Sequence, residues 1–139
     1  MSESRQSTAV AIGARAVLIE GAPGLGKSSL ALALIDRGAT LIGDDSVMLE
    51  AVDGMLLAGP HPNTRGLLEV RNLGLLAFPV RDRVKVARVL RLSPHAPRHV
   101  DAAGEIEVSG IALPLLEFHP DSPVLAIKAE LALSRFGLG

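Results

Sequence analysis

An eight-residue segment, Gly21 to Ser28, constrains this chain more than any other feature. It consists of Gly-Ala-Pro-Gly-Leu-Gly-Lys-Ser and matches the pattern GxxxxGK[S/T] at every fixed position. Before it, Ala16 to Glu20 is a short apolar run typical of a buried strand, and after it Ser28 to Arg37 is rich in strong helix formers. Gly38 is placed to end that helix. A strand, a glycine loop and a helix in this order predict a phosphate-binding P-loop in an α/β domain.

Each residue type in the loop has a predicted part in phosphate binding. The glycines let successive backbone N–H groups point at phosphate oxygens, and the start of the helix adds the positive end of its dipole. Lys27 is expected to reach the β and γ phosphates of a nucleotide, and Ser28 to ligate Mg²⁺. The predicted nucleotide-binding residues are Gly21, Ala22, Pro23, Gly24, Leu25, Gly26, Lys27 and Ser28.

Two adjacent acids follow the next predicted strand, Thr40 to Gly43. A right-handed crossover to a parallel strand returns the chain to the sheet edge where the loop lies. Asp44 and Asp45 are therefore expected beside the γ-phosphate, where one carboxylate could hold Mg²⁺ and the other could accept the proton of an attacking hydroxyl. A solvated acidic turn is the alternative. Which of the two would be the base stays open at this point.

The rest of the chain predicts further strands and one more helix. Asp53-Gly54 favours a tight turn between strands at Ser46 to Glu50 and Met55 to Ala58. Additional strands are predicted at Leu67 to Arg71, Leu73 to Phe78, Val84 to Leu92 and Ile106 to Leu113. In the third of these, alternation places Val84, Val86, Leu90 and Leu92 on one face. Ser122 as an N-cap and Pro123 as the first helical residue predict a helix to about Arg135.

Composition fits one folded domain and excludes several classes of function. The 139 residues are 48% hydrophobic, which suffices for one core over residues 1–139, and the polar residues 1–9 are expected to form a flexible tail. A net charge of −1 without Trp or Tyr argues against nucleic acid as a partner. No apolar run approaches the ~18 residues that span a bilayer, and there is no Cys for disulfides or thiolate metal sites. We expect a cytoplasmic protein without a membrane partner.

Several polar residues outside the loop have a plain structural interpretation. Glu69 and Arg71 lie two apart, on one face of a predicted strand, where a cross-strand ion pair would account for them. A solvated strand face accounts for Arg81, Arg83, Arg88 and Arg91. Neighbouring prolines place four histidines in loops, so no metal site is expected at His61, His95, His99 or His119.

The segments GAPGLGKSSLALALIDRGATLIGDD and LLEVRNLG resemble the catalytic domain of HPr kinase/phosphorylase, in the short bacterial forms without a separate N-terminal domain. The resemblance spans about Val10 to Arg135. It implies a P-loop α/β fold with a mixed sheet, akin to phosphoenolpyruvate carboxykinase and usually assembled as a hexamer. It also implies a protein serine kinase that uses ATP and Mg²⁺ to phosphorylate HPr, a small phosphocarrier of the sugar phosphotransferase system or its nitrogen-linked relative, and removes the phosphate by phosphorolysis.

The resemblance further implies roles for individual residues. Asp45 matches the aspartate that takes the seryl proton, and Ser28 with Glu69 would hold Mg²⁺. Arg71 lies in a signature of the type EIRGLG, which here is EVRNLG, and Arg98 matches a later catalytic arginine. The implied catalytic residues are Lys27, Asp45, Asp44, Arg71 and Arg98.

The chain departs from the family pattern at three places. Gln6 stands where the family has a histidine, and Asn72 replaces a signature glycine. The segment Pro114 to Ser122 has no Lys or Arg where the family has a basic segment linked to dephosphorylation. The residues that the resemblance assigns to the kinase reaction are present, whereas a histidine and the basic segment linked to dephosphorylation are missing. We therefore expect kinase activity and weak phosphorolysis. The alternatives are a regulator that binds ATP without phosphoryl transfer and a small-molecule kinase built on the same loop.

Overall fold

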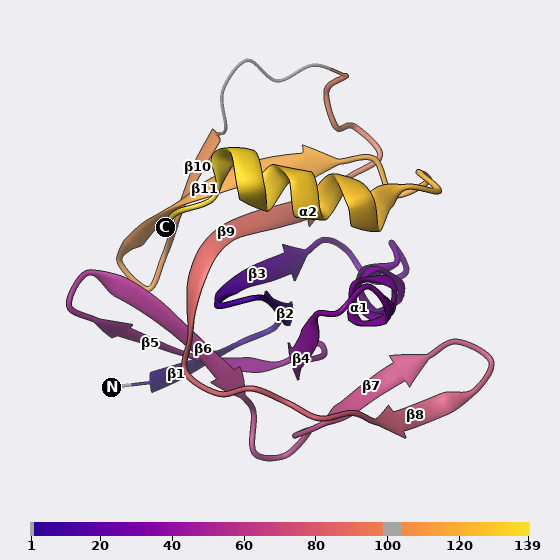
Figure 1. The fold of residues 1–139 in the computed structure, drawn as a ribbon, viewed down its shortest axis with the longest axis horizontal. Coiled ribbons are helices and arrows are strands. Elements are labelled where there is room, and N and C mark those ends of the chain that lie inside the picture. Colours follow the sequence, from indigo (N-terminus) through magenta and orange to yellow (C-terminus); the bar gives the residue numbers. More distant parts are fainter. Residues whose placement is uncertain (1, 99–103) are drawn as a thin grey trace.

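A computed structural model describes residues 2–98 and 104–139 of the chain. In these residues nine strands form one curled sheet, two more strands form a separate hairpin, and two helices pack on the sheet (Figure 1). The elements are β1 (Ser2–Arg5), β2 (Thr8–Ile12), β3 (Arg15–Glu20), α1 (Lys27–Asp36), β4 (Thr40–Gly43), β5 (Val47–Val52), β6 (Met55–Pro60), β7 (Leu67–Val70), β8 (Gly74–Ala77), β9 (Val84–Leu92), β10 (Gly104–Val108), β11 (Ile111–Phe118) and α2 (Leu125–Phe136). The predicted α/β class with a mixed sheet is confirmed. Neither described helix is long and apolar enough to cross a membrane.

Strand β2 separates the two strands that carry the predicted site. It pairs antiparallel with β3 on one side and with β4 on the other. Strands β3 and β4 therefore run parallel to each other, and both end at the sheet edge where β2 begins. The prediction that α1 connects two parallel strands, and that the residues after β3 and after β4 therefore lie at one edge of the sheet, is confirmed.

Along strand β9 both the partner strands and the face of the sheet that its alternate side chains occupy change. It runs parallel to β3 on one side, while its first residues pair with β6 and its later ones with β11 on the other. The pairing with β3 shifts at Ala87, which forms a β-bulge. Val84 and Val86 consequently face one core, whereas Leu90 and Leu92 face the other. The prediction that these four side chains share one face is wrong, because the bulge reverses the alternation.

The two faces of the curled sheet are buried in different ways. Both helices cover one face, where Leu30 and Leu34 of α1 and Leu133 of α2 pack on the strands. On the other face lies a second core, whose described residues all belong to strands. Leu49 and Leu56 come from the β5–β6 hairpin and Leu113 from the β10–β11 hairpin, so both hairpins cover this face. Each of these fully buried leucines contributes about 2 kcal/mol by removal of its apolar surface from water. The two described helices thus cover one face of the sheet, and the curl of the sheet lets its own outer strands cover the other.

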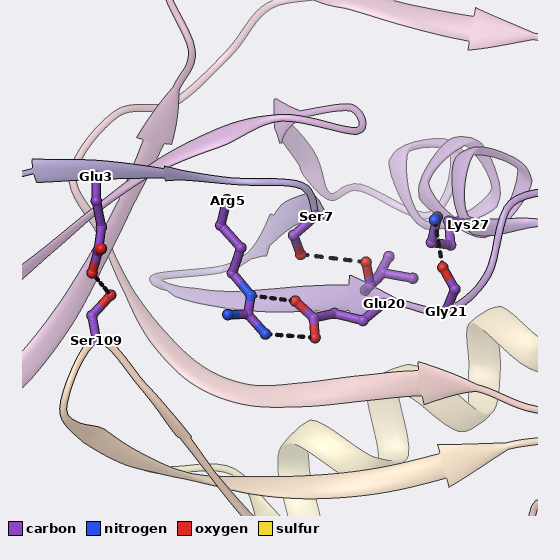
Figure 2. A network of polar contacts seen from close by, with 8 residues as sticks. Glu3, Arg5, Ser7, Glu20, Gly21, Lys27 and Ser109 are labelled. Carbon is purple, nitrogen blue, oxygen red and sulfur yellow. Dashed lines mark hydrogen bonds and ion pairs between the residues drawn. The ribbon is translucent and has the colours of Figure 1, made fainter.

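The expected flexible tail over residues 1–9 is wrong for the part that the structure describes. Strand β1 pairs with β5, and Thr8 and Ala9 already belong to β2. Arg5 also donates two hydrogen bonds to Glu20, at 2.5 and 2.9 Å, and Ser109 donates one to Glu3 (Figure 2). The first three side chains of β1 are exposed and the strand has no apolar residue, so it is held by backbone pairing and by Arg5, which a search for apolar residues misses.

Two elements near the C-terminus also differ from their predictions. The single strand expected at Ile106 to Leu113 is a hairpin of β10 and β11, because Ser109 and Gly110 adopt φ values of 52° and 81° and reverse the chain. The last helix begins at Leu125 rather than at Pro123. The Ser122 hydroxyl accepts a hydrogen bond from the Val124 amide at 3.3 Å, which forms a turn ahead of the helix.

Arg88 does not lie on a solvated strand face, although Arg81 and Arg83 are exposed as predicted. Its side chain is 0% exposed and lies beneath α2. Nη1 donates to the carbonyl oxygen of Ala132 at 2.9 Å, while Nε and Nη2 have no partner among the described residues. Burial lowers the pKa of Arg88 to about 10. A buried cation with a single hydrogen bond costs stability.

We predict that Arg88→Met leaves the free energy of unfolding unchanged or raises it by about 1 kcal/mol, because methionine fills the space without a charge to desolvate. Arg88→Ala should lie about 2 to 5 kcal/mol below the methionine variant, because it leaves a cavity. Urea unfolding followed by circular dichroism measures both values. Equal losses in the two variants would show that the guanidinium itself stabilises the fold.

Candidate functional site

The glycine-rich loop, residues 21–28, joins the end of β3 to the start of α1. Gly26 is the N-cap of α1 with φ 97°, in the left-handed region that favours glycine. The Lys27 ammonium donates a hydrogen bond to the carbonyl oxygen of Gly21 at 2.6 Å (Figure 2). The lysine side chain therefore folds back across the loop and places a positive charge at the N-terminal end of α1.

A cleft of about 240 Å³ lies against this loop. Its lining residues come from the start of β2, the loop, the turn after β4 and the end of β7: Gln6, Thr8, Pro23, Gly24, Gly26, Lys27, Ser28, Ser29, Asp44, Asp45, Glu69 and Arg71. The structure thus brings together every predicted catalytic and metal residue except Arg98.

Asp44 is the centre of the hydrogen bonds in this cleft. Its Oδ1 accepts hydrogen bonds from the Ser28 hydroxyl at 2.7 Å and from the Thr8 hydroxyl at 3.0 Å. Its Oδ2 accepts one from the backbone amide of Glu69 at 3.0 Å. Three donors from α1, β2 and β7 therefore fix the orientation of one carboxylate.

Asp45 has a different environment from its neighbour. Its backbone lies in the left-handed region, with φ 62°, and its amide donates to the Thr8 hydroxyl at 3.1 Å. The chain turns sharply here, since a Cβ added to Gly43 would lie 2.6 Å from the carbonyl oxygen of Ser46. Within residues 2–98 and 104–139 the Asp45 carboxylate makes no hydrogen bond or ion pair. It is therefore available to accept a proton in the cleft.

Glu69 and Arg71 reach the cleft from the separate hairpin of β7 and β8 (Figure 1). The expected cross-strand ion pair is not found among the described residues, because the partner of Glu69 across the hairpin is Leu75. The exposed hairpin carries both charges into the cleft instead. The hydrogen bond from the Glu69 amide to Asp44 attaches this end of the hairpin to the site.

Arg98 lies elsewhere. It borders a hollow of about 620 Å³ formed by the end of β11 and α2, which shares no lining residue with the cleft. Glu117 and His119, from the segment that departs from the family pattern, border the same hollow. Gln6 does line the cleft, and it also borders a hollow of about 610 Å³ on the other side of the glycine loop. His99 lies outside the described residues.

The cleft suits a magnesium ion that arrives with a phosphate ligand. Among the described residues no group of three or more His, Cys, Asp or Glu forms a complete metal site. Mg²⁺, however, is usually held by one or two carboxylates together with waters and phosphate oxygens. The Ser28 hydroxyl, with Asp44 at 2.7 Å and Glu69 on the same cleft, provides such a partial ligand set.

Thr8 is the functional candidate that the sequence analysis missed. It sits at the start of β2, inside the segment expected to be a flexible tail. The continuous apolar run that follows Thr8 in Thr8–Ile12 could have revealed the strand, but it gives no sign that the strand separates β3 from β4. That neighbour relation, which no local pattern encodes, places the Thr8 hydroxyl between the two acids.

The two adjacent acids should respond differently to the same substitution. Asp44→Asn leaves at least one of three donors facing an NH₂ group, so the free energy of unfolding should fall by about 1 to 3 kcal/mol. Asp45→Asn should leave it within about 0.5 kcal/mol, because no side-chain bond is lost and asparagine tolerates a positive φ. Urea unfolding of the two variants tests this, and similar losses at both positions would contradict the geometry.

Comparisons with known proteins agree with this architecture. A family model described as the HPr serine kinase C-terminal domain matches residues 2–83. The HPr kinase/phosphorylase of Clostridium tetani is 44% identical over 63 residues, covering 45% of this chain and 21% of that protein. The protein of the same name from Listeria monocytogenes is 39% identical over 97 residues, covering 63% and 31%. The chain therefore spans about a fifth to a third of the length of these relatives.

A solved structure of the Hpr(Ser) kinase/phosphatase from Coxiella burnetii has the same fold. It matches with a TM-score of 0.84 over 95% of this chain and 94% of that chain, at 24% sequence identity. The family model covers more than half of the chain, and the resemblance inferred from the loop and from LLEVRNLG is confirmed. The chain belongs to the HPr serine kinase C-terminal domain family.

Proposed function

We propose that this protein is an ATP- and Mg²⁺-dependent protein serine kinase that phosphorylates an HPr-like phosphocarrier. The observation that carries the proposal is the cleft in which an unpaired carboxylate, Asp45, shares a lining with the glycine loop and Lys27. A phosphate site beside a free general base is what transfer to a hydroxyl requires. The names of the relatives support the choice of HPr as the acceptor.

The proposed reaction assigns a step to each group. The serine oxygen of the phosphocarrier attacks the γ-phosphorus of ATP, the bond from that phosphorus to the β–γ bridging oxygen breaks, and ADP leaves. The hydroxyl proton passes to Asp45. Lys27 and the backbone N–H groups of the loop bind the phosphate oxygens, and Arg71 adds a second positive charge at the cleft. Mg²⁺, held by Ser28 and Glu69, would supply charge neutralisation on the phosphates.

The hydrogen bonds separate the roles of the two acids. Asp44 accepts three hydrogen bonds, so its oxygens are engaged in orienting Ser28, Thr8 and the hairpin. Asp45 has no such engagement and lies on the same cleft. We therefore assign the base to Asp45 and the orientation of the metal-side hydroxyl to Asp44. Arg98 does not line the cleft, so its catalytic role stays a prediction. The hexamer, the cytoplasmic location and the likeness to phosphoenolpyruvate carboxykinase stay predictions.

The first test follows transfer of label from ATP to purified HPr in the presence of Mg²⁺. Lys27→Ala should abolish transfer, because the charge that faces the β and γ phosphates is lost. Asp45→Asn should keep ATP affinity nearly unchanged, measured by calorimetry, while transfer to the partner serine falls about 100-fold or more. Met55→Leu, on the exposed end of β6 outside the cleft, is a matched control that should transfer at the normal rate.

The location of the label separates the alternatives. Label on a serine of HPr supports the proposal, whereas label on a small molecule from a cell extract would indicate a small-molecule kinase. ATP binding without any transfer would indicate a regulator. A normal rate in Asp45→Asn would remove Asp45 as the base, and transfer by Lys27→Ala at the normal rate would refute the phosphate site.

We also predict that the reverse reaction is weak. Phosphorolysis brings inorganic phosphate beside a phosphoserine, so the site gathers several negative charges and needs cationic groups to hold them. The cleft carries a neutral Gln6 at the position of the family histidine, and the segment from Pro114 onward lies on another hollow. With partner protein and Mg²⁺ saturating, phosphate-dependent release of pyrophosphate should be slow beside ATP-dependent phosphorylation. Comparable rates in both directions would contradict this prediction.

A further inference from the structure

We propose that Thr8 is a positioning residue of the cleft, whose hydroxyl sets the orientation of both acids. The expected effect of Thr8 on catalysis rests on the proposed function, in which Asp45 is the base. The placement of Thr8 itself rests only on the geometry. No other described hydroxyl contacts both Asp44 and Asp45.

The Thr8 hydroxyl makes one donated and one accepted hydrogen bond. Its oxygen donates its one hydrogen to Asp44 Oδ1 at 3.0 Å and accepts a hydrogen bond from the Asp45 amide at 3.1 Å. Because a hydroxyl has a single hydrogen, donation to Asp44 leaves only lone pairs for the amide. The two contacts are therefore compatible, and one buried oxygen links the side chain of Asp44 to the backbone of Asp45.

The position of Thr8 in the fold holds these two hydrogen bonds in place. The residue is 0% exposed and belongs to β2, which is held by pairing on both sides. The turn that it holds is unfavourable by itself, because Asp45 has a φ of 62° that non-glycine residues seldom adopt. A buried hydrogen bond to the Asp45 amide offsets that cost and fixes the direction in which the carboxylate leaves the backbone.

The consequence concerns the rate of the chemical step rather than nucleotide binding. In the part of the chain that the structure describes, Lys27 and the rest of the glycine loop make no hydrogen bond to Thr8, so the phosphate site should keep its shape when the hydroxyl is removed. The backbone of Asp45, by contrast, loses the hydrogen bond from its amide that fixes where the carboxylate points. Misplacement of a base by about 1 Å is enough to lower a rate about 100-fold.

The test compares Thr8→Val, which keeps the shape and removes the hydroxyl, with Thr8→Ser, which keeps the hydroxyl. In Thr8→Val we expect kcat to fall about 10- to 100-fold while KM for ATP changes less than about twofold. Thr8→Ser should retain most of the rate. Ser7→Ala is the matched control, because Ser7 is also buried but donates its hydrogen bond to the carbonyl oxygen of Ile19, at 3.4 Å (Figure 2). It should behave as the wild type.

A double-variant cycle separates positioning from general destabilisation. In the Asp45→Asn background the base is already lost, so adding Thr8→Val should cost less than about twofold. An equal loss in both backgrounds, or a normal rate in Thr8→Val, would overturn the proposal. If Thr8→Val does not fold, Thr8→Ala provides the same comparison with a smaller side chain.

A measurement that does not depend on catalysis distinguishes failure of the Thr8 proposal from failure of the proposed kinase function. Hydrogen exchange of the Asp45 amide should quicken about 10-fold or more in Thr8→Val and stay unchanged in Ser7→Ala, because only the former loses its acceptor. Should the wild type show no kinase activity, the proposed function fails while this measurement still decides the placement of Thr8. Unchanged exchange of that amide in Thr8→Val would refute it.

Discussion

The carboxylate of Asp44 is the interaction on which the arrangement of the cleft depends. It accepts hydrogen bonds from the start of α1, the start of β2 and the hairpin of β7 and β8. These segments are distant in sequence, and no other described side chain contacts all three. An acid with this many donors is suited to orienting its neighbours. In the proposed reaction this leaves proton transfer to Asp45, so the adjacent pair would divide two tasks that the sequence alone leaves undivided.

The curled sheet explains how a chain with few described helices supports such a site. Strand β9 pairs with three strands, and its bulge lets the sheet bend while both faces stay buried. The same bulge directs Arg88 beneath α2, where a cation is poorly satisfied. At the edge of the sheet that carries the site, β2 pairs regularly with β3, and its pairing with β4 has one register shift at Ala9 and Val10.

Local chemistry was predictable from the sequence, and long-range pairing was not. The glycine loop, the helix after it and the strand before Asp44 follow from residue type and spacing, and their agreement with the structure is close. Polar β1 and the β9 bulge depend on backbone pairing with distant strands, which no periodicity reports. The β10–β11 turn, by contrast, has a local signal in Ser109-Gly110 that the sequence analysis missed. In the site, Glu69 and Arg71 were expected from the family signature and reach the cleft. Thr8 was missed, because its importance comes from the order of strands.

The position of β2 between β3 and β4 also sets the width of the site. Neighbouring strands lie about 4.8 Å apart, so the backbones of β3 and β4 are separated by two such intervals, about 10 Å, and the side chains of the loop and of Asp44 bridge this gap. This separation comes from backbone hydrogen-bond geometry and is the same whichever side chains occupy the strands. Substitutions within the sheet can therefore alter stability while the distance across the site stays constant. Because β2 lies between β3 and β4, the loop and the acids stand on alternate strands, and the cleft lies over the start of the intervening strand, where Thr8 is.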